Sequence, residues 1–133
     1  FAGSLEPGDG PAANGTPGPD LFADVERELA EELRFVAGDV ELVRLTGVVE
    51  DVRLRQPELI FRAKTRLTRA RVEAQLDAAE HRGCVAIRAE PAAVAAACAD
   101  RELTPVAVAS LLLWGRIAFG DEWFAAAARG TGM

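Results

Sequence analysis

Apolar side chains recur at helical spacing directly after residue 20. The apolar positions of this stretch are Leu21, Phe22, Val25, Leu29 and Leu33. Intervals of three and four residues place such positions on one face of an α-helix. Pro19 and Asp20 precede them and form a plausible start signal. The pattern predicts an amphipathic helix over residues 20–35, with its apolar stripe facing a core.

Two β-rich runs follow a turn at Gly38. Residues 40–54 and 58–67 are rich in Val, Leu, Ile, Phe and Thr, and a turn near residues 55–57 separates them. The simplest arrangement is an antiparallel pair of strands.

Helical composition dominates the last third of the chain. Pro91 stands at a tolerated first-turn position of an Ala-rich stretch, which predicts a helix over residues 90–101. The Thr104-Pro105 pair starts a further helix that runs to about Phe119 and closes at Gly120. Residues 121–133 either extend this helix or fray.

The segment between the β-rich runs and these helices is less regular. Residues 68–83 suit a short helix or an irregular crossover that ends at Gly83. The short apolar run over residues 84–89 suits a buried strand. A Pro- and Gly-rich stretch over residues 7–19 predicts a flexible loop near the amino terminus.

Length and charge limit the classes of function. The 133 residues, half of them hydrophobic, fit one globular domain over residues 1–133. The net charge of −6 argues against nucleic-acid and anionic-membrane partners. The longest apolar run, residues 106–114, is about half of what a bilayer requires. Cys84 and Cys98 lack metal-site spacing and fit buried thiols of a cytoplasmic protein.

Three carboxylates gather on the first predicted helix. Glu31 and Glu32 lie three and four residues after Glu28, so the three side chains share one helix face. Like charges at this spacing destabilise an isolated helix by roughly 0.2–0.5 kcal/mol per pair. A hard divalent cation such as Mg²⁺ or Mn²⁺ would convert this repulsion into affinity. The alternative is an ordinary solvated face, on which Arg27 pairs with Glu31.

The residues around these acids resemble the Nudix box, G-x5-E-x7-R-E-U-x-E-E-x-G-U, in which U is a bulky aliphatic residue. The stretches are "AGSLEPGD" at 2–9 and "RELAEELRF" at 27–35. Phe35 fills the last apolar place. The other matching positions are Gly3, Asp9 in place of the first Glu, Arg27, Glu28, Leu29, Glu31 and Glu32. The resemblance implies an α+β fold, in which a mixed β-sheet lies between helices.

The chain departs from the family pattern in three ways. Seventeen residues separate Asp9 from Arg27 where the family has seven, so the loop carries an insert. Arg34 replaces the glycine that usually ends the box helix, which requires another helix stop such as Gly38. Strands normally precede the box, so the resemblance implies that the first strands are missing.

The resemblance also implies roles for individual residues. Glu28, Glu31, Glu32 and the backbone carbonyl of Ala2 would hold Mg²⁺. Glu28 would also orient or deprotonate the attacking water, and Arg27 would brace the carboxylates. A further acid from a later loop often assists in this family.

The candidate for that further acid is Glu80, whose alternative is to cap a short helix. His81 beside it fits a surface histidine. Arg44, Arg53 and Arg55 are candidates for binding substrate phosphates, or else solvated arginines on the strands. Trp114 and Phe119 lie in an apolar helix and fit a core better than a base-stacking site.

The implied activity is a metal-dependent pyrophosphohydrolase acting on a nucleoside diphosphate linked to another moiety. The long insert, the missing glycine and the closing helix resemble those of the UDP-sugar diphosphatase branch of the family. This resemblance would imply hydrolysis of UDP-glucose to UMP and glucose 1-phosphate. ADP-ribose and related substrates stay open. The alternatives are a catalytically inactive Nudix-fold binding module and a plain interaction domain; the sequence does not fix the oligomeric state.

Overall fold

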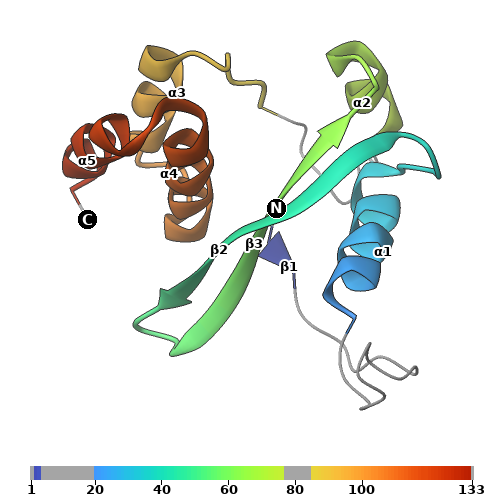
Figure 1. Cartoon of the computed structure of the whole chain (residues 1–133), viewed down its shortest axis with the longest axis horizontal. Coiled ribbons are helices and arrows are strands. Elements are labelled where there is room, and N and C mark those ends of the chain that lie inside the picture. Colours follow the sequence, from blue (N-terminus) through green and yellow to red (C-terminus); the bar gives the residue numbers. More distant parts are fainter. Residues whose placement is uncertain (1, 4–19, 77–84, 133) are drawn as a thin grey trace. The chain divides into compact units, whose positions relative to one another are not determined.

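The described residues form five helices and a small sheet. A computed structural model describes residues 2–3, 20–76 and 85–132 (Figure 1). The elements in chain order are β1 (Ala2–Gly3), α1 (Leu21–Leu33), β2 (Val40–Asp51), β3 (Gln56–Thr65), α2 (Arg69–Gln75), α3 (Pro91–Cys98), α4 (Pro105–Phe119) and α5 (Asp121–Gly130). The α+β class predicted from the sequence is therefore confirmed.

The chain divides into two compact units. The described parts of the first unit are Ala2, Arg44–Arg62 and residues 85–132. Those of the second unit are Gly3 and residues 20–43 and 63–76. A single Nudix-like domain over residues 1–133 stays a prediction.

The predicted strand pair is present. β2 and β3 are joined by residues 52–55, a connection so short that the strands must run antiparallel. The Asp51 side chain accepts hydrogen bonds from the backbone N–H groups of Arg53 (2.8 Å) and Leu54 (3.2 Å), which fixes the turn. The strand order is β1-β3-β2, so β3 is central.

The helix starts follow from local side-chain chemistry. Asp20 Oδ1 accepts from Ala23 N at 3.1 Å, and Thr104 Oγ1 accepts from Ala107 N at 3.2 Å. Each bond satisfies a backbone donor that the first helical turn leaves unpaired. Pro91 and Pro105 occupy the first positions of α3 and α4, as the sequence predicts.

The helices of the first unit enclose an apolar core. α3, α4 and α5 lie together in Figure 1, and their buried residues are Val94, Cys98, Val108, Leu112 and Ala127. Trp114 and Phe119 pack against this cluster with their rings edge to face, 5.5 Å apart between centroids. Their assignment to the core is confirmed.

Two predictions for the last third of the chain need revision. Residues 85–89 form no strand, and the Val85 side chain is 84% exposed. A short apolar run does not by itself distinguish a strand from a loop. Here the run is a loop whose half-buried Ile87 packs against the core. Residues 121–130 form the separate helix α5, because Gly120 takes a φ of +94° and breaks the helical path.

Within the described residues, no helix combines the length and the apolar character needed to cross a bilayer.

Candidate functional site

The acidic face predicted from the sequence lies on α1. Val25 and Leu29 are buried, with 4% and 3% of their surfaces exposed, and they fix which side of the helix faces inward. The acidic residues occupy the remaining faces. The side chain of Glu28 is 19% exposed and that of Glu31 is 61% exposed. Glu32 is half-buried and has contacts within the chain.

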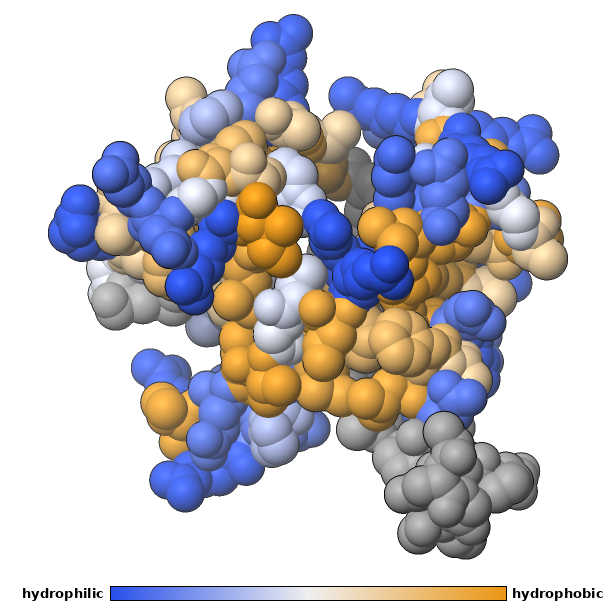
Figure 2. Space-filling model, viewed as in Figure 1, coloured by the Kyte–Doolittle hydropathy of each residue, from blue (hydrophilic) through white to orange (hydrophobic). Residues whose placement is uncertain are grey.

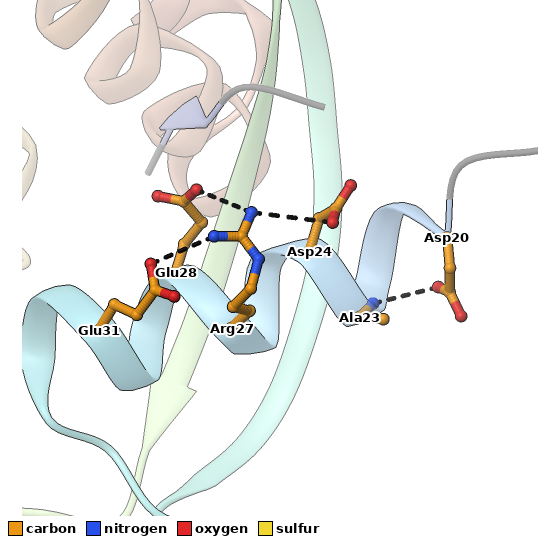
Figure 3. Close-up of polar contacts among 6 residues, drawn as sticks. All are labelled: Asp20, Ala23, Asp24, Arg27, Glu28 and Glu31. Carbon is orange, nitrogen blue, oxygen red and sulfur yellow. Dashed lines mark hydrogen bonds and ion pairs between the residues drawn. The ribbon is translucent and has the colours of Figure 1, made fainter. Parts of the chain in front are cut away.

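Arg27 links the acids of this helix. Its Nη1 donates to Glu31 Oε2 at 3.2 Å, and its Nη2 donates to Glu28 Oε1 at 3.2 Å (Figure 3). The same Nη2 lies 3.8 Å from Asp24 Oδ1. One guanidinium therefore partly neutralises three carboxylates, as the bracing role of Arg27 requires. The Arg27–Glu31 pair was also predicted by the reading of α1 as a solvated face.

Asp24 is a member of this network that the sequence analysis missed. Its side chain is 16% exposed, less than that of Glu31. The spacing signal was present, because Asp24 stands three residues before Arg27 and four before Glu28. It was overlooked because the box pattern contains no residue at this position.

The end of α1 differs from the prediction. The helix ends at Arg34 and not at Gly38, because Arg34 itself takes the left-handed conformation with φ +58° and ψ +27°. The Leu29 carbonyl accepts hydrogen bonds from the backbone N–H groups of Arg34 and Phe35. Arg34 thus adopts, at the position that the predicted box assigns to glycine, a conformation that glycine adopts without steric penalty. Gly38, with φ +91°, instead forms the turn into β2.

The donors on α1 suit a hard cation. Mg²⁺ commonly takes one or two protein carboxylates and completes its coordination with waters and substrate phosphate oxygens. Glu28 and Glu31 each have one oxygen bonded to Arg27 and a second oxygen outside these two bonds. Among the described residues, however, no three His, Cys, Asp or Glu side chains lie close enough to hold a metal ion together.

Other predicted site residues are placed elsewhere or lie outside the description. Ala2 is part of β1, next to β3 in the sheet. Asp9, Glu80, His81 and the insert at 7–19 lie outside the described residues. Their roles stay predictions.

The three candidate phosphate-binding arginines lie on β2 and the turn after it. Arg44, Arg53 and Arg55 are exposed. Arg55 Nε lies 3.3 Å from Glu50 Oε1, so this guanidinium already has a carboxylate partner. Phosphate binding by these residues stays a prediction.

A cavity of about 430 Å³ lies within the first unit, between the end of β2 and the start of α4. Its apolar wall comes from Val49, Val52, Pro105, Val106 and Ala109. Apolar surface lies among charged side chains at this tip of the hairpin in Figure 2, where Val52 and Leu54 are 79% and 70% exposed. Among the described lining residues, none belongs to the predicted box.

No protein-family model, curated protein or solved structure matches this chain.

Proposed function

We propose that the chain is a Nudix-type, metal-dependent pyrophosphohydrolase that cleaves a nucleoside diphosphate linked to another moiety. The supporting observation is the convergence of Glu28 and Glu31 on the single guanidinium of Arg27. The helix ends at Arg34 in a left-handed conformation, which glycine adopts without steric penalty. The proposal includes a Nudix-like sheet between helices and action in the cytoplasm on a small-molecule substrate.

The proposed reaction adds water across a phosphoanhydride. With UDP-glucose, a water oxygen bonds to phosphorus, the bridging P–O bond breaks, and UMP and glucose 1-phosphate leave as products. Bound Mg²⁺, or Mn²⁺, would neutralise the charge that builds on the phosphoryl oxygens. Glu28, Glu31, Glu32 and the Ala2 carbonyl are the proposed ligands.

The remaining roles belong to side chains near this helix face and to one later acid. Glu28, the more enclosed of the two acids bonded to Arg27, would orient the water and accept its proton. Arg27 would hold the side chains of Glu28 and Glu31 in place for binding the metal ion and the water. Glu80 is the proposed assisting acid.

Hydrolysis assays test this proposal. Release of UMP from UDP-glucose should require Mg²⁺ and should fall roughly 100-fold or more in Glu28→Gln, because a positioned base contributes about 10²–10⁴-fold. Glu31→Gln and Glu32→Gln should also lose most activity. Glu26→Gln is the matched control, since Glu26 is an exposed acid of α1 outside the box pattern. ADP-ribose serves as the second substrate, because the sequence does not fix which moiety is linked to the nucleoside diphosphate.

A second candidate is a catalytically inactive Nudix-fold module that binds nucleotide or a partner. It is favoured by the ion pairs of Arg27, which reduce the repulsion among the acids without any metal. Metal binding without turnover of either substrate would support this module. Absence of both would indicate that the box pattern is coincidental.

A further inference from the structure

The outer edge of β2 carries a self-complementary sequence. In the part of the chain that the structure describes, β2 pairs with β3 on one side only (Figure 1). An edge strand offers backbone N–H and C=O groups that can pair with a further strand. The part of β2 that belongs to the first unit begins at Arg44 and ends at Asp51.

The charges of this edge match those of a second copy in one register. When two copies of β2 lie antiparallel around a two-fold axis at Gly47, residues equally far from Gly47 face each other. Arg44 then lies opposite Glu50, and the symmetry makes this pair twice. An axis at Leu45 would place Thr46 opposite Arg44, an axis at Thr46 would place Val48 there, and an axis at Val48 would place Val52 there. None of these three registers pairs Arg44 with an acid.

The two faces of β2 fit the same register. A Cβ at Gly47 would lie 2.9 Å from Leu113 Cδ1, so the odd-numbered residues face α4. The even-numbered residues therefore point to the opposite face, where Val48 is 59% exposed. In the paired strands Thr46 lies opposite Val48 on that face, and Leu45 lies opposite Val49 on the α4 face. Such cross-strand pairs of β-branched and aliphatic residues stabilise sheets.

We propose that the chain forms a two-fold symmetric homodimer in which the outer edges of β2 pair around Gly47. The contacts that Arg44 has within its own chain and the ion pair of Glu50 with Arg55 are compatible with this pairing. A guanidinium has five donors and a carboxylate accepts about four hydrogen bonds, so both groups can serve a partner in each chain. The proposal is independent of the hydrolase function.

A charge-swap experiment on the full chain tests the register. Wild type should sediment as a dimer. Arg44→Glu sets carboxylate against carboxylate at both symmetry-related pairs, and Glu50→Arg sets guanidinium against guanidinium there, so each variant should raise the dimer Kd roughly tenfold or more. Mixing the two variants should restore a dimer, because the mixed dimer opposes two carboxylates of one strand only to two guanidinium groups of the other. The double variant Arg44→Glu/Glu50→Arg should dimerise alone.

This pattern separates pairing across the interface from contacts within one chain. A monomeric wild type, single variants that dimerise as tightly as wild type, or a mixture of folded variants that stays monomeric would each overturn the proposal. Circular dichroism checks that the variants fold. If a variant does not fold, amide hydrogen exchange of wild type decides: exchange over residues 44–51 should slow as concentration rises, and concentration-independent exchange would overturn the proposal.

Discussion

Arg27 Nη1 and Glu31 Oε2 lie 3.2 Å apart across one turn of α1. The same guanidinium also serves Glu28 and approaches Asp24, so its charge compensates a cluster that would otherwise repel itself. The ion pairs reduce the repulsion among these acids without a metal, and removal of Arg27 would leave the acids facing one another uncompensated.

Replacing Arg27 by Ala should destabilise the chain by about 1 kcal/mol at low salt, since several partly exposed ion pairs are lost and like charges remain. The loss should shrink at high salt, because exposed charges are screened. Urea denaturation at two ionic strengths measures both effects. Arg69→Ala, which removes one i,i+4 pair with Glu73, is the control and should lose only about 0.3–0.5 kcal/mol. A salt-independent loss for Arg27→Ala would contradict the electrostatic explanation.

Glycine at position 34 should stabilise the chain. Arg34 has a φ of +58°, and the left-handed conformation costs a non-glycine residue roughly 1 kcal/mol. Arg34→Gly should therefore raise the free energy of unfolding by up to about 1 kcal/mol relative to Arg34→Ala. The Ala variant is the reference because it also removes the contacts of the Arg34 side chain. Equal stability of the two variants would refute the strain assigned to this position.

The sequence predicted those elements whose signals are local. The starts of α3 and α4 and the end of α4 were predictable because Pro91, Thr104 and Gly120 act on the backbone next to them. The stop of α1 was not, because Arg34 lacks the chemistry that identifies a left-handed position, and only the surrounding fold imposes it. The separate helix α5 was also missed, since its start depends on the backbone turn at Gly120 and on packing against α4.

The candidate site was predictable to a similar extent. Helical spacing correctly placed Glu28, Glu31 and Arg27 on the same helix, and it predicted the Arg27–Glu31 pair. Spacing does not reveal which oxygens the guanidinium engages, because rotamers depend on what surrounds each side chain. The observed rotamer of Arg27 also brings its guanidinium close to Asp24, a residue that the family pattern gave no reason to select.

A methyl group at Gly115 should disrupt the packing of α4 against α5. A Cβ at this buried position would overlap the six-membered ring of Trp123, which the bond from Trp123 Nε1 to the Pro91 carbonyl (3.0 Å) helps to hold in place. Gly115→Ala should destabilise the chain by about 1–3 kcal/mol, the usual range for overpacking.

Gly130→Ala is the matched control for this substitution. A Cβ at Gly130 meets nothing within 4 Å, so this variant should be neutral or slightly more stable. Thermal denaturation followed by tryptophan fluorescence compares the two variants. Equal melting temperatures would show that α4 and α5 do not approach each other closely at Gly115.

Stability should fall in alkaline solution because of Cys98. Burial raises the pKa of the Cys98 thiol above its ordinary value, and its side chain is 2% exposed. The unfolded thiol ionises near pH 8.5, so above about this pH the unfolded state binds fewer protons than the native state and folding weakens. Below that pH both states keep the proton and the thiol adds no pH dependence.

Urea titrations between pH 7 and pH 10 measure this effect. The sequence contains no Tyr and a single Lys, so few other groups ionise in this range. Cys98→Ala should show a smaller decline over the same range, even though it is less stable at pH 7. An identical decline in both proteins would assign the alkaline weakening to another group.

Direct titration with Mn²⁺, followed by its electron paramagnetic resonance signal, tests the central claim that the carboxylates of α1 hold a divalent cation. Wild type and Glu26→Gln should bind the ion with the same affinity, Mg²⁺ should displace it, and Glu28→Gln and Glu31→Gln should each weaken binding at least about tenfold. Equal affinity in all four proteins, or no binding by folded wild type, would contradict the claim.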